Sequence, residues 1–102
     1  MEMHRQGDIL FVRVNENEIP EDAREQKDGV VAKGEVTGHH HRIKPGAVAT
    51  LLVAANMAAW IRARGNTDIV HEEHDTITLP PGDWEVRRQR EYEPAGWRQV
   101  AD

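Results

Sequence analysis

The sequence predicts one all-β domain of mostly antiparallel strands, folded as a small barrel or a sandwich. Short runs of β-branched and aromatic residues recur along the chain at close, regular spacing, which is typical of such folds. Turn-forming segments separate these runs, as at Lys44-Pro45-Gly46 and Pro80-Pro81-Gly82-Asp83. The length of 102 residues matches one domain with a modest core, so we expect a single β domain over residues 1–102.

The first strand is expected over residues 8–14, which follow Gly7 and are rich in β-branched and aromatic side chains. Residues 15–29 are polar and acidic and contain Pro20, so they predict a solvated loop. Residues 29–36 predict a second strand, which leads into the first group of histidines.

Residues 47–64 allow two interpretations. Their alanines favour a helix, which would make the fold α+β. The interruption at Asn56 and the turn at Gly65-Asn66 favour two strands instead, and we expect strands.

The last third of the chain continues the β pattern. Residues 67–79 predict a strand region, and residues 80–83 predict a tight turn between antiparallel strands. The alternation over residues 84–92 predicts another strand, and residues 97–100 predict a last strand that closes the sheet.

The composition narrows the possible functions. No cysteine is present, so disulfides and thiolate metal sites are excluded, and imidazole and carboxylate are the available metal ligands. A net charge of −5 argues against sequence-independent binding of nucleic acid. No apolar run approaches the ~20 residues of a membrane span, and the start lacks the apolar stretch of a signal peptide, so we expect a cytoplasmic protein. A domain this small often completes its core against a second copy, so a homo-oligomer is also expected.

Five of the six histidines fall in two groups, the first being His39-His40-His41. Successive side chains of a strand point to opposite faces, so His39 and His41 would share a face with the apolar Ile43. His40 and Arg42 would point the other way.

The second group is His71-Glu72-Glu73-His74. In a strand, His71 and Glu73 would share the apolar face of Ile69, Ile77 and Leu79, whereas Glu72 and His74 would face solvent. In a helix, His71 and His74 would lie three residues apart on one face, which is another common spacing of metal ligands.

If the two strands adjoin, His39, His41 and His71 would meet in the interior, with Glu73 or His74 as a fourth ligand. Such a set suits Zn, Fe, Mn, Ni or Cu. A site of this kind often keeps an open position for water or for a small-molecule ligand, so it could be catalytic. The pattern therefore predicts a small metal-binding β-barrel protein.

Two other functions fit the same residues. A metal-independent phosphodiesterase or ribonuclease would use histidine and Glu73 to move protons and Arg42 to stabilise the charged phosphorane. The histidines could also be ordinary polar residues of a structural or interaction module. Arg87, Arg88 and Arg90 form a basic cluster, but interleaved glutamates predict cross-strand ion pairs on a solvated face.

One partial resemblance is to the cupins, which carry a His-x-His pair and a later Pro-x-Gly turn before a further histidine. Here His39 and His41 form the pair, and Glu85, after Pro80-Pro81-Gly82-Asp83, stands where a cupin has that histidine. The glutamate that cupins place after the pair is absent, since residues 42–48 contain no acid. The resemblance implies a cupin-like barrel.

The chain also resembles a group of small uncharacterised bacterial and phage-associated proteins. The similar segments are Thr37-Gly38-His39, His71-Glu72-Glu73-His74, Leu79-Pro80-Pro81-Gly82 and Gln89-Arg90-Glu91-Tyr92. This resemblance implies the same site residues and supplies no activity.

Overall fold

The computed structural model describes residues 2–33, 39–88, 90–93 and 96–99. Every strand pairing in it is antiparallel, and the one helical segment described is a single 3-10 turn, η1 (Glu16–Glu18), so the all-β prediction is confirmed. The strands are β1 (Met3–Gln6), β2 (Ile9–Val14), β3 (Arg24–Glu25), β4 (Val30–Lys33), β5 (His40–Ile43), β6 (Ala49–Val53), β7 (Ala59–Ala63), β8 (Thr67–Val70), β9 (Ile77–Leu79), β10 (Gly82–Arg88), β11 (Arg90–Glu93) and β12 (Gly96–Gln99).

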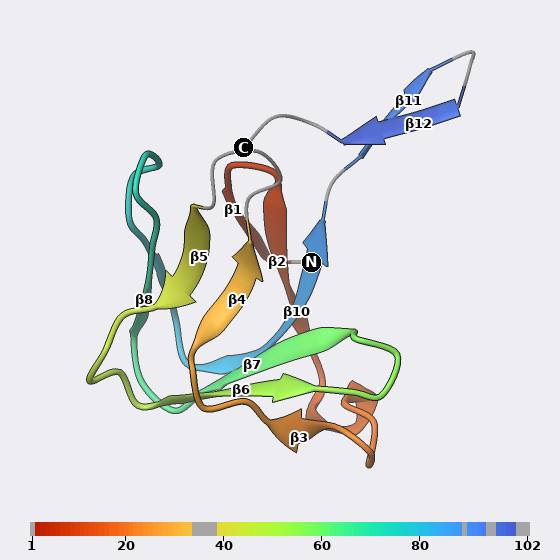
Figure 1. Ribbon diagram of the computed structural model, residues 1–102. Coiled ribbons are helices and arrows are strands. Elements are labelled where there is room, and N and C mark those ends of the chain that lie inside the picture. The colour runs from red at the N-terminus through yellow and green to blue at the C-terminus, as the bar shows by residue number, and fades with distance from the viewer. Residues whose placement is uncertain (1, 34–38, 89, 94–95, 100–102) are drawn as a thin grey trace.

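Two sheets form the body of the molecule (Figure 1). The larger has the strand order β1-β2-β10-β7-β6-β3, and the smaller has the order β4-β5-β8-β9. No described strand pairing joins the two sheets, so they pack as layers and do not close into a barrel. The sandwich alternative is therefore right, and the barrel alternative is wrong. The cupin-like barrel suggested by the His-x-His pair is wrong for the same reason.

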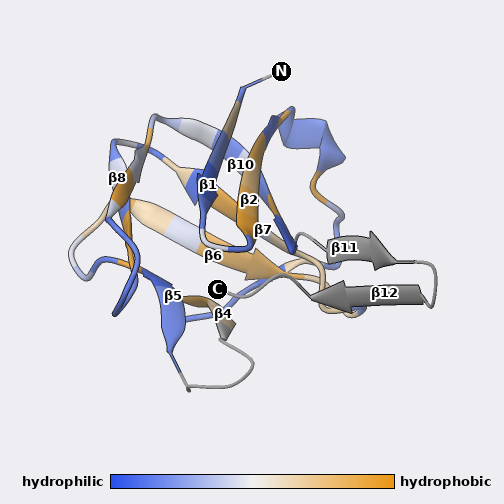
Figure 2. Cartoon of the chain, turned by 90° about the horizontal axis from the view of Figure 1, so that it is seen from above, coloured by the Kyte–Doolittle hydropathy of each residue, from blue (hydrophilic) through white to orange (hydrophobic). Residues whose placement is uncertain are grey.

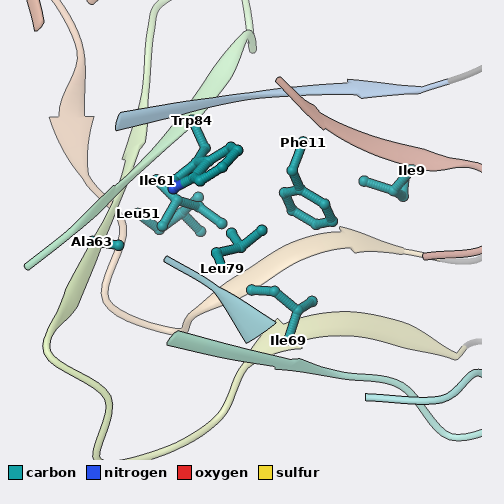
Figure 3. Close-up of a cluster of buried hydrophobic side chains, with 8 residues drawn as sticks. All are labelled: Ile9, Phe11, Leu51, Ile61, Ala63, Ile69, Leu79 and Trp84. Atoms are coloured by element: carbon teal, nitrogen blue, oxygen red, sulfur yellow. The ribbon is translucent and has the colours of Figure 1, made fainter. Parts of the chain in front are cut away.

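The core lies between the two sheets (Figure 3). It draws on alternate positions of the strands, as the period of two requires. Its side chains are nearly inaccessible to solvent: Ile9, Phe11, Leu51, Ile61, Ala63, Ile69, Leu79 and Trp84. Each large apolar side chain buried in this way stabilises the fold by about 1.5–3 kcal/mol.

Residues 47–64 form a hairpin of two strands, β6 and β7, so the helix alternative is wrong. Leu51 pairs with Ile61, and both point into the core. The alanines at the loop, Ala54 and Ala58, are joined by a backbone hydrogen bond of 2.9 Å. Burial of one face of the hairpin overrides the helix propensity of alanine.

The region 67–79 divides into β8 and β9, which pair with each other across the loop 71–76. The segment that follows, residues 80–83, was expected to be a tight turn of a hairpin. It instead connects β9 of the smaller sheet to β10 of the larger one, so that prediction is wrong in its pairing. Arg13 holds the crossover by donating from Nη1 to the carbonyl oxygen of Pro81 at 3.0 Å.

The two ends of the chain differ from expectation in other ways. β1 was not predicted, although it pairs with β2 along its whole length. β12 pairs with β11 in a separate two-stranded sheet, so it does not close either main sheet. The predicted strand 29–36 is found as β4, and its last three residues lie outside the described residues, as does the Thr37-Gly38 pair. No helix in the described part of the chain is long and apolar enough to span a membrane.

Candidate functional site

Three segments far apart in the chain meet at one end of the molecule (Figure 1). They are the turn between β1 and β2, the start of β5, and the loop between β8 and β9. The ring centroids of His41 and His71 lie 4.3 Å apart, those of His71 and His74 lie 4.5 Å apart, and those of His39 and His71 lie 5.5 Å apart. We call these four residues the histidine cluster.

The β1–β2 turn approaches the cluster closely because it contains Gly7. Gln6 pairs with Ile9, so Gly7 and Asp8 form a two-residue hairpin loop. Gly7 has φ +61°, as the first position of a type II′ turn requires. A Cβ atom at this position would lie only 2.6 Å from Nε2 of His74. The glycine therefore allows both the turn and its contact with the histidine ring.

His41 is fully buried, and the side chain of Gln6 sets its tautomer. The Gln6 amide nitrogen donates to the carbonyl oxygens of Ile69 at 2.8 Å and of Asp75 at 2.9 Å. Both amide hydrogens are thereby used, and Oε1 of Gln6 is an acceptor 2.9 Å from His41 Nδ1. His41 must donate from Nδ1, so the lone pair of the neutral ring lies on Nε2.

Asp8 lies beside His41 and is also fully buried. Its Oδ2 accepts a hydrogen bond of 2.9 Å from Nη1 of Arg88, at the end of β10. Its Oδ1 makes no hydrogen bond and lies 3.8 Å from His41 Nε2. A carboxylate oxygen and an imidazole lone pair thus face each other in a buried space, an arrangement that a cation between them stabilises.

His71 shapes the loop that carries the second group. Its Nδ1 accepts the backbone N–H groups of Glu73 at 3.0 Å and of His74 at 3.3 Å. The lone pair is therefore on Nδ1, and the proton of the neutral ring is on Nε2. His71 and His41 hold opposite tautomers although their rings are in contact.

His74 was expected to face solvent if residues 71–79 formed one strand, and that expectation is wrong. Residues 71–76 form a loop, so the alternation of a strand does not apply to them. The His74 Nε2 atom is buried and has no hydrogen bond, and its ring is stacked with that of His41 at 6.0 Å. His74 therefore belongs to the interior of the cluster.

His39 is the outermost member of the cluster, and the other predicted residues lie at the rim or outside it. His39 Nδ1 is 3.3 Å from a carboxylate oxygen of Glu73, and the Glu73 side chain is 59% exposed. Arg42 is largely exposed and pairs with Glu72 at 3.6 Å, so it does not serve the cluster as a buried anion-binding group. A hollow of about 290 Å³ lies between Arg42, Val70, His71 and Glu72.

Glu72 ties the loop to β5 on this outer side. Its carboxylate accepts the backbone N–H of His40 at 3.1 Å. This hydrogen bond is the main reason why the pKa of Glu72 lies below its ordinary value, and the charge of Arg42 adds a smaller effect in the same direction. Glu72 is thus a negatively charged clamp between the two histidine-bearing segments.

The structure brings four of the five predicted ligands, His39, His41, His71 and His74, into one cluster and places Glu73 at its rim. Among the residues it describes, no three histidine, aspartate or glutamate side chains already form a group that could hold a metal ion. A bound ion would therefore require side-chain movements.

Sequence analysis missed Asp8, Gln6 and Arg88. An aspartate after glycine is an ordinary turn residue, so nothing in the local pattern marked Asp8 as buried. Arg88 was expected on a solvated face, but it donates to Asp8. Its neighbour Arg87 pairs with Glu85, but both residues lie on β10, whereas the interleaved charges had predicted pairs between strands.

Comparison with known proteins gives a family and no activity. A family model described as "Domain of unknown function (DUF8820)" matches residues 5–89, a range that includes β1 to β10 almost entirely. No curated protein and no solved structure matches the chain.

Proposed function

We propose that this chain, which belongs to the DUF8820 family, binds a divalent transition-metal ion in its histidine cluster. The observation that carries the proposal is the contact between the rings of His41, His71 and His74, together with the buried Asp8 carboxylate 3.8 Å from His41 Nε2. Imidazole and carboxylate are the ligands that Zn, Fe, Mn, Ni and Cu ions use in proteins that lack a thiolate site.

The separation of His41 Nε2 and Asp8 Oδ1 supports a bound cation. A protonated imidazole that donated to this carboxylate would approach to about 2.7–2.9 Å. The observed 3.8 Å is too long for a hydrogen bond. Two donors bound at about 2.0–2.2 Å to one ion lie roughly 3.0–3.6 Å apart, so a closure of a few tenths of an ångström would let one ion contact both atoms.

The free-energy cost of burying polar atoms without hydrogen bonds also favours a bound cation. An ionised carboxylate with an unpaired oxygen is costly to bury, and the Arg88 guanidinium satisfies only Oδ2. His74 Nε2 adds a second buried polar atom without a hydrogen bond. A single cation bound to Asp8 Oδ1 and His74 Nε2 would satisfy both atoms. It would thereby offset the cost of keeping so polar a cluster beside the core. Figure 2 shows how hydrophilic β5 is compared with the core strands.

The test is element analysis of protein purified without an affinity tag, followed by calorimetric titration of Zn²⁺ into the chelator-treated protein. We expect about one ion per chain. His41→Ala and His74→Ala should weaken binding at least 10-fold, and His40→Ala, on the opposite face of β5, should change it little.

Circular dichroism of each variant separates loss of binding from loss of fold. If His41→Ala does not fold, His74→Ala carries the comparison, because His74 lies on a loop. A folded wild-type protein that takes up no metal ion would contradict the proposal, and so would equal losses in His40→Ala and His74→Ala.

A further inference from the structure

We infer that the metal is held by Asp8 Oδ1, His41 Nε2 and His74 Nε2, and that His71 is a positioning residue and not a ligand. This inference rests on the proposed function and goes beyond it by assigning a role to each side chain. Asp8 was not among the expected ligands, and His71 was one of the three central ones.

The first argument concerns the tautomer of His41. Gln6 is anchored to two backbone carbonyl oxygens, so it can only accept from His41 Nδ1. A histidine that binds a metal commonly donates its other ring N–H to an oxygen, which fixes the ring and raises its basicity. Gln6 supplies that oxygen, and Nε2 is thereby directed towards Asp8.

The second argument concerns Asp8 and His74. Arg88 donates to Oδ2 of the Asp8 carboxylate, and the other oxygen, Oδ1, lies 3.8 Å from His41 Nε2. Gly7, immediately before Asp8, is in contact with Nε2 of His74. Asp8 and His74 are therefore both adjacent to Gly7, Asp8 in the chain and His74 in space, and neither Asp8 Oδ1 nor His74 Nε2 forms a hydrogen bond.

The third argument removes His71 from the donor set. To bind a metal through Nε2, a neutral His71 would have to carry its proton on Nδ1. That nitrogen accepts the backbone N–H groups of Glu73 and His74, so both hydrogen bonds would be lost. Coordination through Nδ1 would lose them as well. His71 therefore acts through the loop, whose bend presents His74.

Two imidazoles and one carboxylate leave coordination positions open. Such a donor set is typical of metal centres that exchange water or a small anionic or neutral ligand at the metal. The site would thus bind an exchangeable ligand, unlike a structural zinc site with four protein donors.

The test exploits the ability of asparagine to imitate the turn. The side-chain oxygen of asparagine accepts backbone N–H groups two or three residues on, as His71 Nδ1 does, but the amide is a poor metal ligand. We would measure Co²⁺ affinity by calorimetry and the visible absorption of bound Co²⁺, which reports the donor set, for wild type, His71→Asn, His71→Ala, His74→Asn and Asp8→Asn.

We expect His71→Asn to bind Co²⁺ within about 3-fold of wild type with an unchanged spectrum. His71→Ala should bind about 10-fold more weakly, through the loosened loop, and keep the spectrum. His74→Asn and Asp8→Asn should lose at least about 10-fold in affinity and change the spectrum of any residual complex.

The outcomes separate the two proposals. Absence of Co²⁺ binding by the folded wild-type protein contradicts the proposed function. Normal binding by wild type with a changed spectrum in His71→Asn, or an unchanged spectrum in Asp8→Asn, overturns the assignment alone. Circular dichroism and unfolding of each variant show that the compared proteins are folded.

Discussion

Gly7 is restricted in two independent ways, by its backbone and by its surroundings. Its φ of +61° is one that residues with a side chain rarely adopt, and a Cβ would meet the ring of His74. The position therefore couples the geometry of a hairpin turn to the placement of a candidate ligand. Substitutions here separate backbone strain from steric conflict.

We predict that Gly7→Ala destabilises the fold by about 2–4 kcal/mol, the sum of strain at positive φ and displacement of His74. Gly46→Ala is the matched control, because Gly46 also has positive φ (+91°) but no atom within 4 Å of a built Cβ. It should lose only about 1 kcal/mol. Urea unfolding of both variants gives the comparison.

A double-mutant cycle locates the difference. Removal of the ring in His74→Ala should recover part of the Gly7→Ala loss, because the steric conflict disappears and only the backbone strain stays. If the two changes in the free energy of unfolding are strictly additive, the contact between position 7 and His74 does not contribute to the loss.

Residue-level prediction from the sequence succeeded where a residue lies in a strand. His41 is buried and Arg42 exposed, as the alternation in β5 requires. The same rule failed for His74, because residues 71–76 are bent by the hydrogen bonds to His71. Asp8 could not be identified because its burial depends on His41 and Arg88, which are distant in sequence.

At the scale of single elements, the β1–β2 hairpin is fastened at its open end by Glu2. The carboxylate accepts hydrogen bonds from His4 Nε2 at 3.0 Å and from Arg13 Nε at 2.9 Å. These bonds lower the pKa of Glu2 below 4.5, the His4 bond having the larger effect. A depressed pKa means that the interaction stabilises the fold above about pH 4.5 and is lost as the pH falls through the lower folded-state value.

We predict that His4→Phe raises the pKa of Glu2 towards 4.5, measured by NMR titration of its side-chain carboxyl carbon. The ring centroids of His4 and Trp84 lie 5.2 Å apart, and phenylalanine keeps a ring in that place. The substitution therefore removes only the N–H that donates to Glu2. Because Glu2 is exposed, 0.5 M salt should reduce the difference between the two proteins. A Glu2 pKa that is the same in wild type and variant would contradict this account.

The β6–β7 hairpin contains a local conflict that the sequence did not reveal. Met57 has φ +72° and is 79% exposed, at a turn where the N–H of Met57 bonds to the oxygen of Ala54. Glycine is the residue expected at such a position. The strands on either side were predicted from the length of the segment, the interruption at Asn56 and the turn at Gly65-Asn66, but nothing in the sequence predicted a positive φ at Met57.

Met57→Gly should therefore leave the stability unchanged or raise it by up to about 1 kcal/mol, since relief of strain offsets the greater freedom of the unfolded chain. Met57→Val should lose about 1–2 kcal/mol, because a β-branched side chain tolerates positive φ poorly. Thermal unfolding of the three proteins distinguishes these results. A less stable glycine variant would show that the Met57 side chain stabilises the fold by contacts.

At the scale of the whole molecule, the candidate ligands connect the two sheets. Asp8 follows β1 of the larger sheet, whereas His41 lies on β5 and His74 on the loop beside β8, both in the smaller sheet. The sheets share no described strand pairing, so their packing depends on side chains. An ion held by all three residues would add a link between the layers that the apolar core does not supply.

Metal binding should consequently stabilise the entire fold. At a free metal concentration 100 times the dissociation constant, binding adds about 2.7 kcal/mol, which raises the melting temperature by roughly 13 °C for a domain of this size. Scanning calorimetry of the chelator-treated protein with and without Zn²⁺ measures the shift.

Protons compete with the metal for imidazole nitrogens, so the shift in melting temperature should shrink as the pH is lowered from about 7.5 to about 5.5. His40→Ala should retain the pH-dependent shift and His74→Ala should lose it, because each removes one imidazole but only His74 belongs to the proposed donor set. If His40→Ala loses the shift as well, the distinction between His74 as a ligand and His40 as a residue outside the donor set is wrong.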